Sequence, residues 1–135
     1  MSDPHPAASQ PSRVFAWNAL EVLSNTNGAA RPILDRATST LDRLEAHIST
    51  VAAGVASHPP HRHPDEEIVF VKEGILEITI NGEFSVAPAG SFAFFASNDL
   101  HGMRNTGDAP ATYLVIRWTS PGHEGPRPPS AQAGV

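Results

Sequence analysis

The stretch HPPHRHPDEEIVFVKEG, residues 58–74, places three histidines and a run of acids before an almost continuous apolar segment that ends at a glycine. A stretch of this kind is either a solvated, proline-rich loop or a metal site, and residue spacing separates the two. Residues two apart on a strand point to the same face, so His61 and His63 can present two imidazoles side by side. The spacing therefore favours a metal site.

Glu67 is the carboxylate candidate for the same ion. On a straight strand it would lie about 13 Å from His63, at ~3.3 Å per residue. That is too far for a shared ion, whose ligand bonds are about 2.0–2.2 Å long. Pro64 and Asp65 favour a turn, so we predict a hairpin that carries ligands on both arms. One further nitrogen ligand has to come from elsewhere, either His101 in NDLHGMRN or His47 in LEAHIST. Spacing alone does not choose between them.

The length and the ends of the chain predict one folded domain. A mass of 14.3 kDa suits a single core and is too small for two ordinary domains. Both ends are rich in proline, and the C-terminal end is also rich in glycine and alanine. We therefore expect a flexible segment over residues 1–12, a domain over 13–119 and a flexible tail over 120–135.

Composition excludes several classes of function. The net charge of −5 leaves no basic patch, so we expect neither nucleic acid nor membrane as a partner. Cysteine is absent, so any metal has to be held by nitrogen and oxygen. There is no signal-peptide pattern and no apolar run of the roughly 18 residues that a membrane helix needs. We expect a cytoplasmic protein.

Short runs with strand chemistry, closed by turn residues, follow one another along the domain. Asn81-Gly82 between two such runs is a strong hairpin signal, because a type I′ turn needs positive φ at both positions. Pro32 makes 31–37 an edge strand, since proline cannot donate to a ladder. The β-branched residues of 39–51 favour a strand over a helix. The predicted runs are 13–23 (with a helical turn as the alternative), 31–37, 39–51, 67–73, 75–80, 83–87, 92–96, 100–105 and 111–118. The class predicted is all-β, a sandwich or small barrel.

These residues resemble the cupins, whose first motif has the form G-x5-H-x-H-x3/4-E-x6-G and whose second has the form G-x5-P-x-G-x2-H-x3-N. His61, His63, Glu67 and Gly74 fit the first motif, with Gly54 one residue out of place. The second motif fits at the five positions Gly82, Pro88, Gly90, His101 and Asn105, with ten residues instead of two between the last glycine and the histidine. The resemblance covers roughly residues 41–118.

The resemblance implies a small single-domain cupin with a double-stranded β-helix (jelly-roll) barrel. It also implies one divalent transition metal per chain, Fe, Mn, Ni or Zn, with the ligands His61, His63, Glu67 and His101. Three neutral imidazoles and one carboxylate leave a divalent ion with a net charge near +1 and open coordination positions. Such a centre suits a small, chelating, oxygen-rich and anionic substrate.

Three classes of function are consistent with that centre. The first, which we favour, is a dioxygenase-like enzyme, because the open positions admit both a chelated substrate and dioxygen. The second is a non-redox isomerase, cyclase or lyase that uses the metal as a Lewis acid. The third is a small-molecule-binding cupin without catalysis. The chain has no helix-turn-helix partner, which argues against a transcription-factor role.

Residues around the predicted ion are assigned more coarsely. Side chains that could line a substrate pocket are Arg43, Glu45, His47, Phe94, Met103 and Arg117. Arg43, Glu45 and His47 lie in segment 39–51 and share one face of the predicted strand. The sequence pattern leaves open whether that face is the inner one. Phe92 and Phe95 could wall the cavity with Phe94, whereas Met103 suits packing.

Among the neighbours of the ligands, Asp65 suits a solvated turn, Glu66 should face away from the ion, and Asn105 could orient an imidazole. Residues 14–37 are apolar enough to cover a neighbour's sheet edge, and small cupins commonly pair in this way. We therefore expect a homodimer.

Overall fold

Antiparallel strands account for nearly all the regular structure of residues 9–122, the part of the chain that this computed structural model describes. Residues 1–8 and 123–135, which hold most of the two predicted flexible segments, lie outside it. A single 3-10 helix, η1 (Trp17–Ala19), precedes the strands, and the described part contains no α-helix. No described helix is therefore long and apolar enough to cross a membrane.

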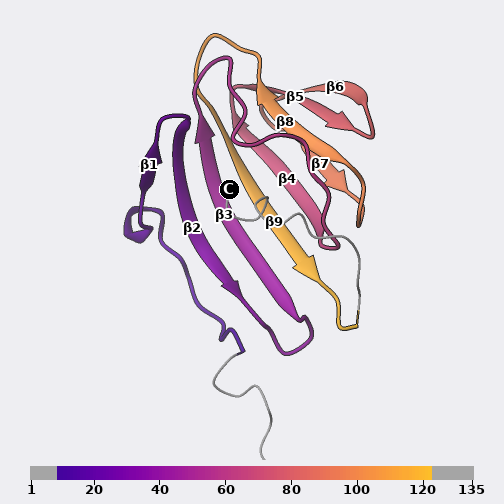
Figure 1. Cartoon of the computed structure of the whole chain (residues 1–135). Coiled ribbons are helices and arrows are strands. Elements are labelled where there is room, and N and C mark those ends of the chain that lie inside the picture. Colours follow the sequence, from indigo (N-terminus) through magenta and orange to yellow (C-terminus); the bar gives the residue numbers. More distant parts are fainter. Residues whose placement is uncertain (1–8, 123–135) are drawn as a thin grey trace, which may run out of the picture.

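The larger sheet has six strands in the order β1-β2-β3-β9-β4-β7 (Figure 1). They are β1 (Leu23–Asn25), β2 (Gly28–Arg36), β3 (Arg43–Val51), β9 (Ala111–Thr119), β4 (Glu66–Glu73) and β7 (Phe92–Phe95). The nine residues of β3 pair without a break with the nine of β9, and β4 continues the ladder on the other side. This three-strand centre fixes which side chains share a row across the sheet.

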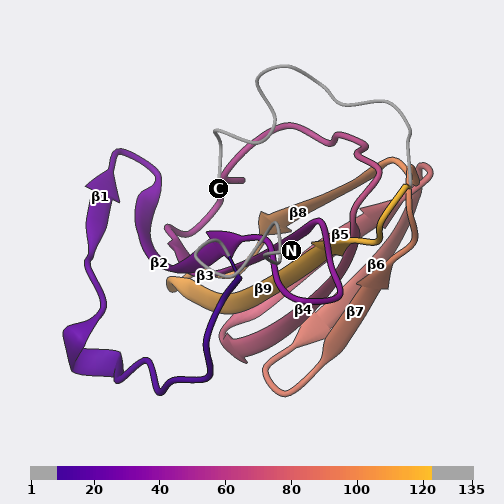
Figure 2. The ribbon, with the colours of Figure 1, turned by 90° about the horizontal axis from the view of Figure 1, so that it is seen from below.

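The smaller sheet holds β6 (Glu83–Pro88), β5 (Ile75–Ile80) and β8 (His101–Asn105), in that order. Residues 54–61 run along the free edge of β8. At one end the Gly54 N–H donates to the Asn105 carbonyl over 2.8 Å, and at the other His61 and His101 exchange two backbone hydrogen bonds of 2.9 Å. In Figure 2, seen from below, the two sheets lie on either side of a common interior.

The core lies between the two sheets. Its buried apolar side chains come from both of them and include Val69, Val71, Leu76, Ile78, Phe95, Tyr113 and Val115. Alternation along each strand points these residues to one face, so every second residue of β3, β4 and β9 faces inward.

The inward row changes character along each central strand. In β9 it runs from Ala111 through Tyr113 to Arg117, and in β3 it runs back from Val51 to Glu45. Because the two strands are antiparallel, their apolar ends coincide and so do their polar ends. The interior therefore has an apolar half, which supplies the core, and a polar half, where the candidate site lies.

Two glycines show why the chain turns where it does. Asn81 and Gly82 have φ of 50° and 86°, as the predicted type I′ hairpin requires. Gly74 ends β4 with φ of 83°, and a Cβ there would lie 2.9 Å from the Cα of Ala111. Gly74 is thus needed for both its backbone conformation and the close approach of β9.

Three local predictions need correction. Segment 13–23 holds η1 and the start of β1, not one long strand. The strand around Pro32 begins earlier, at Gly28, although its part beyond Ala30 is indeed an edge because β1 pairs only with 28–30. The predicted hairpin with ligands on both arms is wrong, because His61 pairs with His101 and not with β4.

Candidate metal centre

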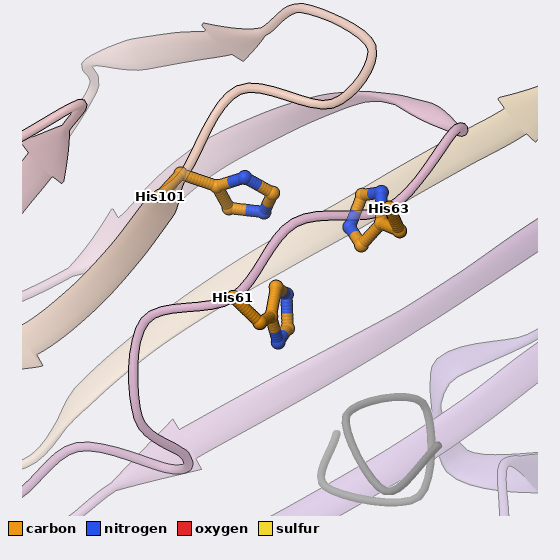
Figure 3. A group of neighbouring side chains, drawn as sticks. All are labelled: His61, His63 and His101. Carbon is orange, nitrogen blue, oxygen red and sulfur yellow. The ribbon is translucent and has the colours of Figure 1, made fainter. Parts of the chain in front are cut away.

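His61, His63 and His101 converge in the polar half of the interior (Figure 3). Each offers a ring nitrogen, and these nitrogens all lie within 4.8 Å of one another. The backbone pairing of His61 with His101 brings together two residues that lie far apart in the sequence, and the loop that follows carries His63 inward. All three rings are buried, as ligands of an enclosed ion would be.

Glu67 completes this group from β4. Its Oε1 lies 3.0 Å from Nε2 of His63 and 3.4 Å from Nε2 of His101. Two ligands at right angles on one ion, each bonded at about 2.0–2.2 Å, are themselves about 3 Å apart. The observed separations therefore fit a shared ion.

Backbone carbonyls fix the orientation of two of the rings. Nδ1 of His63 lies 3.1 Å from the Asp65 carbonyl, and Nδ1 of His101 lies 2.9 Å from the Asp99 carbonyl. A carbonyl only accepts, so both Nδ1 atoms carry the proton and donate it. In a neutral ring each Nε2 then presents a lone pair toward the Glu67 carboxylate. Converging lone pairs and a negative oxygen call for a cation between them, and a metal supplies it.

Unpaired polar atoms and pKa values lead to the same conclusion. Nδ1 of His61 and Nε2 of His101 are buried without a hydrogen-bond partner, which is costly unless a ligand binds there. Burial, helped by the neighbouring His58, lowers the pKa of His61 to about 3, so this ring is neutral at physiological pH. Burial alone would raise the pKa of the Glu67 carboxyl, but His101 and His63, which can donate to it as imidazolium ions when no metal is bound, hold that pKa below its usual range. The residues present therefore fit a divalent transition metal.

Two stacked rings wall the group. Phe95 stacks on His101, with ring centroids 4.3 Å apart and an interplanar angle of 11°. His58 stacks on His61 at 4.2 Å and 17°. Sequence reasoning offered Phe95 only as one of three wall candidates and gave His58 no role, because neither contact follows from spacing.

Four of the six predicted pocket residues meet on the inner face of the larger sheet. Arg117 donates from Nε to Oε1 of Glu45 over 2.8 Å, and Oε2 of Glu45 lies 2.7 Å from Nδ1 of His47. Arg43 lies nearer the edge, where it forms a two-pronged ion pair with Asp35 at 2.8 and 2.9 Å. The inner face is thus the one that carries the ionisable residues of β3.

The other two pocket predictions fare differently. Phe94 is wrong as a pocket residue: it is 52% exposed on the outer face, because Ala93 and Phe95 take the inward positions of β7. Met103 does point inward but belongs to the apolar core, in line with the packing role expected for it.

Asp65 is the residue that the sequence misplaced most. It is fully buried, not solvated: its Oδ1 accepts from the Thr119 hydroxyl over 2.6 Å, and its Oδ2 lies 3.5 Å from Nη1 of Arg43. Asp65 lies two residues from both His63 and Glu67, so on an extended segment the three side chains point to the same side. This spacing was the signal in the sequence that Asp65 faces inward. Asn105 donates to the carbonyls of Val51 and Ala109, so it holds a turn and orients no imidazole.

A separate groove of about 640 Å³ lies outside this group, beside residues 54–60 and the smaller sheet. Its lining includes Phe84, Arg104 and His58. The groove adjoins the site at His58, whose ring stacks on His61, and its lining includes the predicted pocket residue Met103 but none of the predicted ligands. The polar interior, not this groove, is where the candidate ligands lie.

A jelly-roll barrel that encloses three buried histidines beside a glutamate of its larger sheet defines the class of the protein, that of the small cupins. The protein-family model described as "Cupin domain" matches residues 47–117. The chain therefore belongs to the cupin family. A search of curated protein sequences gives no match.

Solved structures support the same fold at low sequence identity. An RmlC-like cupin from Shewanella frigidimarina is 15% identical, with a TM-score of 0.66, over 84% of this chain and 96% of that one. A structure described as a sugar phosphate isomerase of the cupin superfamily, from Silicibacter pomeroyi, is 20% identical, with a TM-score of 0.66, over 81% and 77%. A predicted oxalate decarboxylase from Thermotoga maritima is 19% identical, with a TM-score of 0.63, over 79% and 99%. At this identity the likeness concerns the fold alone.

Proposed function

We propose that this cupin is a metal-dependent enzyme that acts on a small, chelating, anionic organic molecule. The observation that carries the proposal is the convergence of His61, His63, His101 and Glu67 with two imidazole lone pairs turned toward one carboxylate. A bound divalent metal (Fe, Mn, Ni or Zn) would supply Lewis-acid polarisation of a carbonyl and, if it is iron, oxygen chemistry.

Arg117 is the residue that would pair with the anionic group of the substrate. It occupies the inward position between Glu67 and Glu45, since it pairs in register with both. Its Nε donates to Glu45 and lies 4.0 Å from Oδ2 of Asp65, and in this proposal its Nη groups would pair with a carboxylate or phosphate. With a divalent ion in place, the positive charges of the ion, Arg43 and Arg117 would balance the negative charges of Asp35, Glu45, Asp65 and Glu67, so an anion would be held by the open positions of the ion and by Arg117.

The metal part of the proposal is tested by elemental analysis. Purified protein should hold about one divalent ion per chain, and the double variant His61→Ala/His63→Ala should lose it. Because imidazole ligands must be deprotonated, occupancy should also fall below about pH 6. Metal content that the double change leaves unaltered would refute the ligand assignment.

The substrate part is tested by calorimetry with oxalate as the probe. Zinc-loaded protein should bind oxalate, and Arg117→Met should weaken that binding at least tenfold without loss of zinc. Exposed Arg104→Met on the outer face is the matched control and should have no effect. Equal oxalate affinity in the wild type and Arg117→Met would remove Arg117 from the site.

Reaction type is tested with an oxygen electrode. We propose a dioxygenase-like reaction first, so iron-loaded protein given diketones, flavonols or hydroxy acids should consume oxygen, and Glu67→Ala should abolish the uptake. A non-redox isomerase, cyclase or lyase is the second candidate, favoured by the ionisable Glu45–His47 pair beside the centre. Turnover under nitrogen without any oxygen uptake would select it. Binding without turnover of any kind would leave a non-catalytic cupin.

A further inference from the structure

Glu45 and His47 form a buried pair on the inner face of β3 that the metal centre does not use. They are 5% and 6% exposed, and Nδ1 of His47 lies 2.7 Å from Oε2 of Glu45. A carboxylate only accepts, so Nδ1 carries the proton and donates it. In the neutral ring the other nitrogen, Nε2, holds the lone pair and is the basic atom.

Both partners of this pair are held in place from outside it. The second oxygen of Glu45 accepts from Nε of Arg117 over 2.8 Å, which prevents the carboxylate from rotating. His47 is 6% exposed, and of its two ring nitrogens Nδ1 is the one that the Glu45 carboxylate holds. The pair thus fixes the orientation of the ring and leaves Nε2 as the atom that could meet a ligand.

The strand register places His47 within reach of a ligand at the metal centre. Glu67, Arg117 and Glu45 form one inward row across β4, β9 and β3, and His47 belongs to the next row. Two strand spacings put the backbones of β3 and β4 about 10 Å apart. Inward side chains from both strands shorten that gap to a span that a small organic acid can fill.

A purely structural ion pair is the competing explanation. Buried ion pairs rarely stabilise a fold more than apolar residues of the same volume would. Here the charged side chains occupy one half of an interior whose other half is apolar, and they adjoin the only cluster of buried histidines in residues 9–122. Ionisable side chains that converge beside a candidate metal centre are candidates for the reacting groups of a site.

We propose that His47 is a catalytic residue that moves a proton to and from a carbon of the bound anion, and that Glu45 is its positioning residue. This inference rests on the proposed function, and it names the substrate class as an anion with a C–H bond next to a carbonyl group. Charged groups that face His47 are Glu45 and Arg43 from β3, Arg117 from β9 and Asp35 from β2.

Pyruvate is a suitable probe because its methyl group adjoins such a carbonyl. The C3–H bond breaks, the proton moves to Nε2 of His47, and the electron pair of that bond forms the C2=C3 double bond. The π electrons of the C2=O bond become a lone pair on an enolate oxygen. Return of a solvent-derived deuteron from Nε2 to C3 restores the keto acid with one deuterium, and no oxidant is needed.

The test follows the loss of the pyruvate methyl signal by proton NMR, in D₂O and under nitrogen, with zinc-loaded protein. Wild-type protein should accelerate exchange, and His47→Gln should lower the protein-catalysed rate about 100-fold or more. Thr50→Val is the matched control, because Thr50 lies on the outer face of the same strand, and its rate should stay within twofold of wild type. Equal exchange in His47→Gln, or no exchange by a wild type that binds zinc and oxalate, would overturn the assignment of the base.

A second readout does not depend on turnover. Nitrogen-15 NMR of the His47 ring should show the Nδ1–H tautomer in wild-type protein and a loss of that preference in Glu45→Gln. Addition of oxalate should shift the Nε2 resonance. An Nε2–H tautomer in the wild type would overturn the proposal while leaving the metal centre intact, whereas loss of zinc and oxalate binding would overturn the proposed function itself.

Discussion

Replacing Arg117 with methionine should destabilise the metal-free protein strongly, because the buried Glu45 carboxylate loses its cationic partner and keeps only the contact with His47. Arg117 and Glu45 are 4% and 5% exposed, and the guanidinium donates from Nε to Glu45 over 2.8 Å. Removing one member of a buried pair costs about 3–5 kcal/mol, since the remaining charge is then incompletely compensated. At about 4 °C per kcal/mol for a domain of this size, the unfolding midpoint should fall by roughly 12–20 °C.

Replacing both members should restore most of that stability. In Glu45→Leu/Arg117→Met the Glu45 charge is gone, Asp65 keeps Arg43 at 3.5 Å, and only His47 loses a hydrogen-bond acceptor, so the free energy of unfolding should return to within about 2 kcal/mol of wild type. Oxalate binding to the zinc-loaded protein should nevertheless stay weak, because the anion has lost its arginine. Stability and binding would thus separate in one variant.

Urea unfolding of metal-free protein, followed by circular dichroism, gives the free energies. The exposed pair Lys72–Glu73, at 3.1 Å, is the control, and Glu73→Gln should change stability by less than about 1 kcal/mol. A cost below about 1 kcal/mol for Arg117→Met would mean that solvent reaches the pair. A double variant as unstable as the single one, or worse, would show that the pair exists for stability and would refute the reasoning.

Three further predictions concern the rest of the fold. Burial raises the pKa of Tyr113, so the folded protein keeps this proton above the unfolded value of about 10 while the unfolded chain loses it, and stability should fall as pH rises past that value. The chain has one tyrosine, so absorbance at 295 nm reports it alone, and an ordinary midpoint in folded protein would contradict the prediction. Gly74→Ala should cost more than Gly82→Ala, by at least about 1 kcal/mol in urea unfolding, because both have positive φ but only Gly74 lies against Ala111. Equal costs would show that the close approach relaxes freely. We also propose a homodimer in which the arm carrying η1 and β1, which stands apart from the barrel in Figure 2, covers the exposed Phe92 of a second copy. Light scattering at micromolar concentration should give a dimeric mass that Leu23→Asp lowers, and a monomeric wild type would contradict the proposal.

The strands and the hairpin turn could be predicted because their causes are local. Asn-Gly is a residue pair that favours the positive φ angles observed at Asn81 and Gly82, and the side chains of β9 alternate between buried and less buried positions along most of the strand. The arm before Gly28 could not be predicted in the same way, since its three-residue strand depends on pairing with β2. Local chemistry thus predicts the elements better than their limits.

The candidate ligands could be predicted because both motifs keep fixed spacings around them. The environment of the ligands could not, since it depends on register. Asp65 accepts a hydrogen bond from the hydroxyl of Thr119, which lies 54 residues further along the chain, and no sequence pattern near Asp65 predicts that contact. Phe94 was predicted to face the pocket but faces outward. Because β7 is short and has aromatic residues on both faces, the alternation of residue types does not indicate which face is buried.

The four candidate ligands do not come from one layer of the barrel, and this gives an ion a second role. Glu67 belongs to β4 of the larger sheet, whereas His101 begins β8 of the smaller one. An ion held by both would act as a cross-link between the sheets, and separation of the sheets would require its release. Free metal at 100 times its dissociation constant would add about 2.7 kcal/mol to the free energy of unfolding. The melting temperature of this barrel should then rise with the concentration of free metal in solution, which makes its persistence in a cell depend on metal supply.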